Sequence, residues 1–489
     1  EGNTYSLIIT QGIYTFIADD YTSSSGEMSV SRIEIFTSKQ GAMENIGFDS
    51  FSVKTDLNSL SPDASLVINE DIEISEDLIL DNLLINGGKN LLLNAGTTLT
   101  LNIDLANFNN GSKSSDGLVI ESNALGTGSL IHSTAGVHGT FERYLNNADW
   151  SNWQDGWHFI SSPVASQVIS PTFTTDPASG YDFYLWHEPT SEWINFKNQS
   201  GGSGTAPFFD VVNGSDNFTV GRGYMAAFDA EDVKSFSGEL NVADVPVSGL
   251  GITATFGNGW HLIGNPFSSA ITWDATTAWV LTNIAGVAKI WNESNQSYSD
   301  LTSSPSSVIP ATNGFMVQVV EATGSLTIPA SKRAHSSQAF YKSAVSGMML
   351  TAKSLTAGNA QEARIVINPD ATKGFDLMFD SEFLAGHAPS FYSLSGEYKL
   401  STNSIPVLTA ETEIPFTFIK NAGSQFSIEA SGFEEIPGIP YLIDLKSGTS
   451  HNLADNPVYN FTAVEGDNSN RFLLKFGMVG VGESPEADN

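Results

Sequence analysis

The chain has 489 residues, a length at which single hydrophobic cores give way to several domains of about 100–150 residues each. Its 54 acidic and 21 basic residues give a formal net charge of −33, which excludes the basic surface needed to bind nucleic acid or an anionic membrane. It has no cysteine, which excludes disulfides, thiolate zinc sites and a cysteine nucleophile. No apolar run reaches the ~20 residues of a membrane-spanning helix, so direct membrane insertion is not expected.

Residues 1–54 are predicted to form part of an N-terminal β-sandwich. Short apolar runs at residues 6–10, 13–18, 28–36 and 46–53 are typical of strands. The segment resembles the end of a jelly-roll or lectin-like sandwich, and its strands are too few to close one alone. We therefore expect either further protein before Glu1 or strands that complete a neighbouring domain.

Residues 55–148 contain apolar triplets separated by Asn, Asp and Gly, such as LVIN, IEIS, LLIN and LLLN. The triplets are too closely spaced for helices, and the Asn and Gly residues between them accept the positive φ of tight turns. The pattern predicts a stack of short strands, either a small β-solenoid or one sheet of a sandwich. Leu91, Leu92 and Leu93 in succession indicate burial on both faces and favour the solenoid.

A phrase that occurs twice indicates a duplicated module, with copies at residues 149–250 and 251–335. GWHFISSPV begins at Gly156 and GWHLIGNPF at Gly259, and each is followed by a Trp-containing strand and then by GYMAAF or GFMVQV. Both faces of GWHFI and GWHLI carry apolar residues, so each phrase is predicted to be a central strand that ends at a Pro. The first copy is longer, and a Gly/Ser-rich insertion after Ser200 accounts for the difference.

Residues 345–478 are predicted to form a C-terminal β-sandwich, followed by a flexible acidic tail at residues 479–489. Strand patterns separated by Gly, Asn, Asp and Pro fall at residues 348–352, 363–368, 375–379, 391–393, 414–418, 425–430, 440–444 and 471–476. The whole chain is therefore predicted to be all-β, with tandem sandwich and solenoid-like domains and a duplicated Trp-containing module.

The order of several phrases after Trp150 resembles the region that precedes the sorting domain in Bacteroidota proteins exported by type IX secretion. These phrases, within residues 150–476, include GWHLIGNPF, KIWNESNQSYSDL, IPATNGFMVQV, ARIVINPDATKGFD, YLIDLKSGTSHNL and NRFLLKF. The resemblance implies a secreted or cell-surface protein that is exported through the outer membrane and has lost a sorting domain after Asn489. It implies no particular activity, because such regions accompany proteases, glycanases and adhesins alike.

The sequence contains no recognised pattern of catalytic or metal-binding residues. Its 8 histidines show no HExxH or HxxxH spacing, and GxSxG does not occur. His158 and His261 recur in the duplicated phrase and are interpreted as structural, since a catalytic residue need not be duplicated with the fold. Glu192 is the carboxylate closest to an aromatic setting. The acidic composition is compatible with Ca²⁺, but no DxDxDG-type loop places an ion, and no other cofactor is evident.

Aromatic side chains of the first module are the candidates for ligand contact. Trp186 and Trp291 correspond between the copies and are therefore assigned to the core. Trp193, Phe208 and Phe209 have weaker counterparts in the second copy, so these three are predicted to contact a ligand or a partner subunit.

These features support three hypotheses about function. The leading one is a non-catalytic exported surface or extracellular protein with a structural, adhesive or assembly role. The first alternative is a carbohydrate-binding accessory region of a secreted glycan-degrading enzyme. The second is a subunit of a surface filament or lattice, since exposed strand edges favour pairing between chains. Glycans, other surface proteins or further copies of the chain are the corresponding partners.

Overall fold

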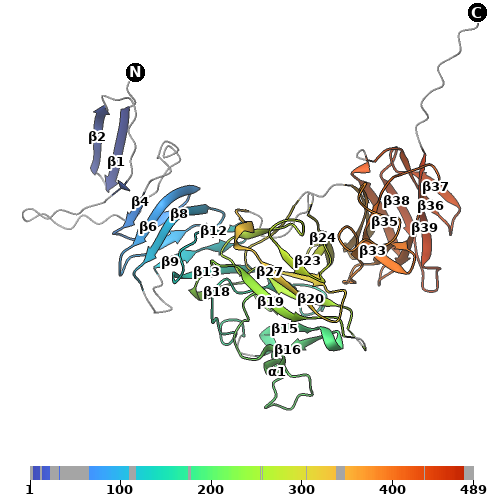
Figure 1. Cartoon of the computed structure of the whole chain (residues 1–489), viewed down its shortest axis with the longest axis horizontal. Helices are drawn as coiled ribbons and strands as arrows, with labels where there is room; N and C mark the ends of the chain where they lie inside the picture. The colour runs from blue at the N-terminus through green and yellow to red at the C-terminus, as the bar shows by residue number, and fades with distance from the viewer. Residues whose placement is uncertain are drawn as a thin grey trace, which may run out of the picture.

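The computed structural model shows an all-β protein, as the sequence predicts. It describes residues 4–11, 14–22, 32–33, 65–109, 117–174, 178–253, 255, 257–303, 306–336, 347–433 and 436–477. In Figure 1 a β-solenoid, two smaller modules and a curled C-terminal sheet follow one another from blue to red. None of the helices in the described ranges is long and apolar enough to cross a membrane.

The N-terminal segment contains a hairpin of β1 (Thr4–Gln11) and β2 (Tyr14–Thr22), which pair antiparallel. The short β3 (Arg32–Ile33) pairs parallel with β4 (Ser65–Ile68), the first strand of the solenoid. The strand predicted at residues 46–53 lies outside the described residues, as does most of the one predicted at 28–36. The partial N-terminal sandwich therefore stays a prediction.

Residues 65–145 form a parallel β-solenoid, whose successive turns add strands to two sheets around one core. One sheet has the order β12-β8-β6-β4-β3, with β6 (Leu78–Ile85), β8 (Thr98–Asn107) and β12 (Ser129–Ile131). The other has the order β18-β13-β9-β7-β5, with β5 (Ile72–Ile74), β7 (Leu91–Leu93), β9 (Leu118–Ile120) and β13 (His138–Leu145). A small hairpin of β10 (Ser122–Asn123) and β11 (Gly126–Thr127) lies between β9 and β12 in the chain.

The solenoid core is built by alternate residues of each strand. Leu91 and Leu93 are fully buried, whereas Leu92 between them is only half-buried. The expected burial on both faces was therefore wrong, because each solenoid strand has one face toward the core and one toward the outside. Polar side chains instead join successive turns on the outside, where the Asn82 amide donates to the Ser65 hydroxyl at 3.0 Å.

A strand that follows the first module's sheet completes the solenoid. β18 (Asp232–Glu239) pairs antiparallel along all of β13, and its sequence falls inside the predicted range of the first module, residues 149–250. It covers a sheet edge that would otherwise expose unpaired backbone groups. Hydrophobic residues of both parts accordingly belong to one core, which contains Leu66 of the solenoid and Phe183 of the first module.

The two copies of the duplicated phrase lead into four-stranded sheets of the same order, so the predicted duplication is present in the fold. The first has the order β14-β17-β15-β16, with β14 (His158–Ile160), β17 (Tyr224–Phe228), β15 (Tyr181–His187) and β16 (Glu192–Asn195). The second has the order β20-β26-β23-β24, with β20 (Trp260–Gly264), β26 (Gly314–Gln318), β23 (Ala288–Asn292) and β24 (Ser297–Leu301).

The second module also carries two three-stranded sheets. One contains β19 (Val245–Leu250), β27 (Gly324–Ile328) and β22 (Val280–Thr282), and the other contains β25 (Ser307–Ile309), β21 (Ala270–Trp273) and β28 (Arg333–Ala334). Since β19 pairs with β27, the second module begins before the predicted boundary at residue 251. In the first module the insertion after Ser200 leads into α1 (Phe209–Asn213). Single turns of 3-10 helix are η2 (Ala178–Gly180), η3 (Glu188–Thr190) and η4 (Ala330–Lys332).

The duplicated phrases lie at the edges of their sheets, so the prediction of central strands was wrong. Within their sheets β14 pairs only with β17, and β20 pairs only with β26. The other module reaches each remaining edge, because Ile160 forms a bridge to Asn313 and Ile263 forms one to Arg222. Since Ile160 and Ile263 hold equivalent positions, the two modules contact each other reciprocally, as subunits do about a two-fold axis.

The C-terminal region is one continuous eleven-stranded sheet that curls around a single core. Its main path is β37-β36-β39-β34-β32-β33-β30-β29-β35-β38, and β31 pairs beside β33. The strands are β29 (Met348–Ser354), β30 (Ala360–Ile367), β31 (Ser381–Glu382), β32 (Ser390–Ser395), β33 (Tyr398–Ile405), β34 (Glu413–Ile419), β35 (Gln425–Ser431), β36 (Ile439–Asp444), β37 (Thr449–Asn452), β38 (Val458–Thr462) and β39 (Asn470–Gly477). The strand predicted at residues 375–379 is wrong, since the chain turns there.

Candidate functional site

A hydrophobic cluster between the two modules is made of equivalent residues from both. Strand registers pair Trp186 with Trp193 in the first hairpin and Trp291 with Tyr298 in the second. The equivalent pairs in the cluster are Trp157 and Trp260, Phe159 and Leu262, Trp186 and Trp291, Trp193 and Tyr298, and Met225 and Met316. The Trp–Phe and Trp–Leu faces of the two phrases thus form the joint between the modules.

Trp186 and Trp291 hold equivalent positions but differ in their hydrogen bonds. Trp186 Nε1 donates to the backbone carbonyl of Trp260 at 2.7 Å. Trp291 Nε1 is buried in the equivalent place and has no hydrogen-bond partner among the described residues. The equivalent acceptor would be the backbone carbonyl of Trp157, which does not bond to Trp291. The indole N–H of Trp157 donates to the Trp153 carbonyl at 2.9 Å. A buried donor without an acceptor costs about 1–3 kcal/mol, so the contact between the modules is less stable around Trp291 than around Trp186.

A cavity of about 290 Å³ lies on the side where the equivalence is broken. It is walled mainly by aromatic side chains from three parts of the chain. These include Trp153, Trp157 and Trp193 of the first module, Trp291 and Tyr298 of the second, and His387 of the C-terminal region. We call this space the aromatic cavity.

The C-terminal region closes the aromatic cavity through residues 385–388, which lie on the turn between β23 and β24. The backbone amide of His387 donates to the Gln296 carbonyl at 2.8 Å. Gly386 permits this contact, because a Cβ at that position would lie 2.5 Å from the Gln296 oxygen. The His387 ring then packs edge-on against Trp153 and Trp291, with ring centroids 4.8 and 5.8 Å apart.

The aromatic cavity is electrically neutral. Of the described residues that line it, none is Asp, Glu, Lys or Arg. Burial lowers the pKa of His387 and raises the pKa of Tyr298, so both side chains are uncharged near pH 7. Tyr298 is only 8% exposed, and its hydroxyl makes no hydrogen bond within the described ranges. Trp153 is 68% exposed and stands at the mouth.

Of the three residues predicted to contact a ligand, one lies at the aromatic cavity. Trp193 lines it and is half-buried, with its ring centroid 5.1 Å from that of Trp186. Phe208 is half-buried at the N-terminus of α1, and Phe209 is fully buried against Phe183. Neither phenylalanine lines the cavity. Ligand contact by Trp193 stays a prediction.

Sequence reasoning missed Tyr298, Trp153 and His387 as members of the site. Tyr298 is the counterpart of Trp193 in the second copy, so a closer comparison of the two hairpins could have found it. Trp153 lies in a turn just before the first phrase. His387 belongs to another part of the chain, and no local pattern indicates a contact between it and Gln296.

The duplicated histidines make structural hydrogen bonds. His158 Nδ1 lies 2.8 Å from Glu293 Oε1, and its Nε2 lies 3.0 Å from the Asn146 carbonyl. Burial alone would lower the pKa of His158, but the Glu293 charge and these hydrogen bonds outweigh it and raise the pKa. His261 Nε2 lies 2.8 Å from the Gly251 carbonyl, and burial lowers the pKa of this imidazole. His158 therefore links β14 to Glu293 and to the backbone at Asn146, and His261 links β20 to the backbone at Gly251.

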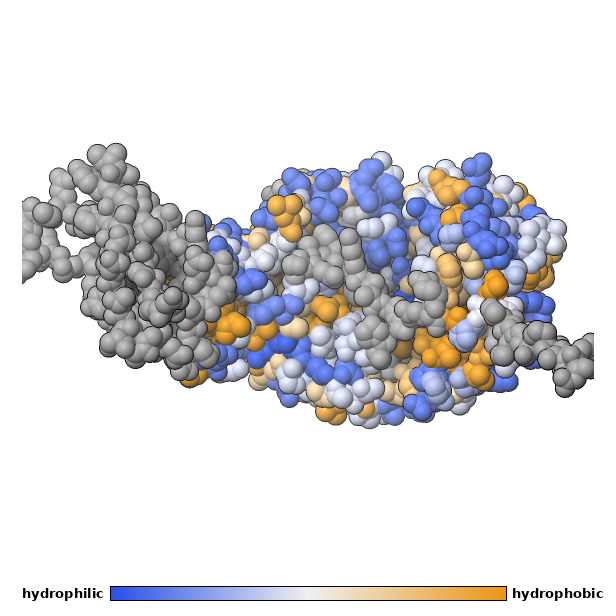
Figure 2. Space-filling model, turned by 90° about the horizontal axis from the view of Figure 1, so that it is seen from above, coloured by the Kyte–Doolittle hydropathy of each residue, from blue (hydrophilic) through white to orange (hydrophobic). Residues whose placement is uncertain are grey.

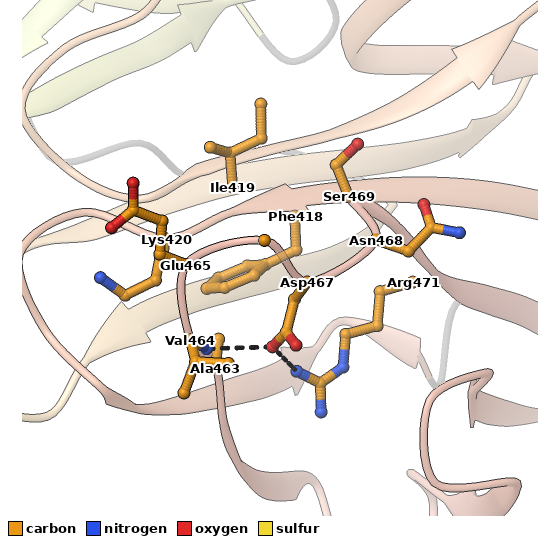
Figure 3. A pocket seen from close by; sticks show the side chains of 11 residues that line it. Phe418, Ile419, Lys420, Ala463, Val464, Glu465, Asp467, Asn468, Ser469 and Arg471 are labelled. Carbon is orange, nitrogen blue, oxygen red and sulfur yellow. Dashed lines mark hydrogen bonds and ion pairs between the residues drawn. The ribbon is translucent and has the colours of Figure 1, made fainter.

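A second cavity, of about 320 Å³, lies in the C-terminal sheet (Figure 3). Two of its charged side chains, Asp467 and Arg471, are paired with groups of the sheet. Asp467 accepts from the Val464 amide at 3.0 Å and lies 3.8 Å from Arg471. Arg471 in turn donates to both oxygens of the buried Asp444, at 2.9 and 2.7 Å. These groups hold the sheet together, so the aromatic cavity is the better candidate for a ligand.

A third cavity, of about 840 Å³, lies in the C-terminal region and is lined by charged residues such as Lys373, Glu397 and Lys399 beside the stacked rings of Phe375 and Tyr398. Its lining is more polar than that of the aromatic cavity. Figure 2 shows hydrophobic residues in separate patches among hydrophilic ones on the visible face. Within the described parts of the chain, no group of three or more His, Asp or Glu residues could hold a metal ion. Glu192, the carboxylate singled out in the sequence, is exposed on β16. A role for Ca²⁺ stays a prediction.

The fold and the aromatic cavity define a multidomain all-β protein with a duplicated central module. A family described as Domain of unknown function (DUF8693) matches residues 297–476. The match begins at the first residue of β24 and includes Tyr298, His387 and nearly all of the C-terminal sheet. Comparisons with curated proteins and with solved structures give no match.

Proposed function

We propose that the chain is a non-catalytic, exported β protein with a structural or adhesive role at the cell surface. The observation that supports this role is a buried ion pair at the joint between the second module and the C-terminal sheet. Buried polar joints of this kind fix neighbouring parts in one arrangement, which suits a protein that must transmit force or hold a binding surface in place.

The ion pair is buried, and its hydrogen-bond partners Ser401 and Thr402 lie about 100 residues further along the chain. Lys289 Nζ donates to Asp300 Oδ1 at 2.5 Å and to the Ser401 hydroxyl at 2.6 Å. The other oxygen of Asp300 accepts from Ser401 at 2.8 Å and from Thr402 at 2.6 Å. Lys289 and Asp300 face each other within the β23–β24 hairpin, and both hydroxyls belong to β33, so the hydrogen bonds to the hydroxyls form only when the two parts are docked.

The solenoid is joined to the second module in a comparable way. The backbone amide of Leu130 donates to the Ser268 carbonyl at 2.9 Å, and the Ser268 hydroxyl donates back to the Leu130 carbonyl at 3.0 Å. Arg333 Nη1 also donates to the His132 carbonyl at 2.5 Å. The parts from the solenoid to the C-terminal sheet therefore contact one another through specific hydrogen bonds.

A surface location and the lack of catalysis are separate parts of the proposal and need separate tests. Protease treatment of intact cells should remove the protein if it is exposed, and the resemblance to exported Bacteroidota proteins supports that outcome. The purified chain should be inactive against panels of glycan, peptide and ester substrates. A robust hydrolase activity that one point change abolishes would overturn the non-catalytic role.

The second candidate function is carbohydrate binding in support of a secreted enzyme, and the aromatic cavity is the observation that favours it. Cavities for small ligands are mostly apolar and contain a few placed polar groups, as this one is with Tyr298 and His387. Retention of the chain on columns of immobilised polysaccharide would test this function without assuming any particular site.

A further inference from the structure

We propose that the aromatic cavity binds a single neutral pyranose ring, which packs against the aromatic side chains and hydrogen-bonds to the Tyr298 hydroxyl. The inference rests on the second candidate function and adds to it a site and a ligand class. It is argued from the polar group left without a partner, from the charge of the lining and from the size of the cavity.

The Tyr298 hydroxyl indicates that the occupant carries hydrogen-bonding groups. Tyr298 is more than nine-tenths buried, lines the aromatic cavity and has no hydrogen-bond partner for its hydroxyl in the described ranges. A purely apolar ligand would cover this hydroxyl and leave it unsatisfied, which is unfavourable. A ligand hydroxyl or ring oxygen removes that penalty, because the neutral phenol both donates and accepts.

The lining indicates that the occupant is uncharged. Aromatic walls also attract quaternary ammonium ions, so a cation must be considered. The chain has 54 acidic residues, yet none lies among the residues that line the cavity. No carboxylate is therefore present to balance a bound cation, and no Lys or Arg is present to balance an anion.

The aromatic lining and the size of the cavity fit one ring with apolar faces. The C–H groups on a face of a pyranose carry partial positive charge, which complements the negative face of an indole. The volume of about 290 Å³ is just below the ~300–1,000 Å³ found for small-molecule sites, so one ring fits and a chain of rings does not. Trp153, 68% exposed at the mouth, is placed to contact a second ring outside.

Variants at the mouth and at the hydroxyl test the site without emptying the core. Trp153→Ala removes an exposed ring and retains the backbone carbonyl that Trp157 uses. Tyr298→Phe removes only the hydroxyl. Trp193→Ala is less suitable, because its ring also packs on Trp186 within the joint. The matched controls are Trp150→Ala, an exposed tryptophan that does not line the cavity, and Tyr398→Phe, which lines a separate cavity on β33 and so also reports any binding there.

The measurement is titration calorimetry of the full chain with methyl pyranosides of glucose, galactose, mannose and N-acetylglucosamine, and with tetramethylammonium chloride. We expect at least one pyranoside to bind. Trp153→Ala and Tyr298→Phe should each weaken binding by about 3–10-fold, and the two controls should leave it unchanged.

Each other outcome contradicts the proposal in a distinguishable way. Sugar binding that neither cavity variant weakens would place the site elsewhere and leave the carbohydrate-binding function intact. Failure of the unmodified chain to bind any pyranoside at saturating concentration, together with no retention on polysaccharide columns, would overturn both. Binding of tetramethylammonium in preference to the sugars would identify the cavity as a cation site.

Discussion

Trp186 and Trp291 hold equivalent positions, but only the Trp186 indole N–H donates a hydrogen bond. Substitutions at the two positions therefore measure what that bond contributes to stability. Trp186→Phe removes the donor to the Trp260 carbonyl, whereas Trp291→Phe removes a buried donor that has no acceptor. Both substitutions lose a similar volume. We therefore expect Trp186→Phe to lower the free energy of unfolding by about 1–3 kcal/mol more than Trp291→Phe, as measured by urea denaturation. Equal losses would show that the two environments do not differ as described.

His132 makes the stability of the chain depend on pH. Burial and the nearby Arg333 charge lower the pKa of His132 from 6.5 to about 4. Because the pKa in the folded state is the lower one, the unfolded chain binds the proton more tightly. The associated stability is fully present above pH 6.5 and is lost as the pH falls toward 4.

The loss amounts to about 3 kcal/mol at pH 4 relative to pH 8. His132→Gln, which cannot take up the proton, should reduce the pH dependence of unfolding between pH 6.5 and 4 by about that amount. The comparison at pH 8, where the imidazole is neutral in both states, gives the cost of the substitution itself. An unchanged pH dependence in the variant would contradict this role.

Among the elements, the contact between residues 385–388 and the β23–β24 turn depends on a glycine. A Cβ at Gly386 would lie 2.5 Å from the Gln296 oxygen and 2.8 Å from Ser297 Cα. Gly386→Ala should therefore push the segment off the turn and lower stability by about 1–3 kcal/mol. Acrylamide should then quench the cavity tryptophans more strongly. Gly374→Ala is the control, since its Cβ would meet its nearest neighbour at an ordinary 3.7 Å.

The elements also show what a single sequence can and cannot predict here. Period-2 alternation and repetition identified β14 and β20 and made them equivalent, because those patterns depend on residues close together in the chain. Alternation could not show that both strands lie at sheet edges, because the place of a strand in its sheet depends on contacts distant in the chain. At its free edge β14 meets Asn313 of the second module, and β20 meets Arg222 of the first.

The candidate site was predicted only in part for the same reason. Trp193 was identified because it belongs to the aromatic residues of the first module and has a weaker counterpart in the second copy. His387 was not, because it reaches the cavity only through the close approach of Gly386 to Gln296. Phe209 was selected because it has a weaker counterpart in the second copy, and the structure places it in the core.

For the whole molecule, the buried pair at the joint predicts how the parts are coupled. Lys289→Met leaves Asp300 buried without its cation, which should lower the free energy of unfolding by about 3–5 kcal/mol. The double variant Lys289→Met with Asp300→Asn should recover a large part of that loss, because no unpaired charge remains. Urea denaturation of the three proteins measures both effects. A mild loss in the single variant would show that the pair does not hold the joint.

The reciprocal contacts between the modules predict that neither is an independent folding unit. The first module gives β18 to the solenoid and receives Asn313 from the second module. A fragment of residues 149–250 should therefore stay largely unfolded by circular dichroism, whereas residues 65–336 should unfold in one cooperative transition. A stable, cooperatively folded fragment 149–250 would contradict this dependence.

The closure of the solenoid by β18 sets an order of events during synthesis. Thr140 in β13 and Ser237 in β18 face each other across 97 residues of chain. At ~5–20 residues per second, that edge stays open for roughly 5–20 s after β13 has been made. An open sheet edge pairs readily with other chains during such an interval. The arrival of the first module with β18 therefore ends the interval in which this edge of the solenoid is open to pairing with another chain.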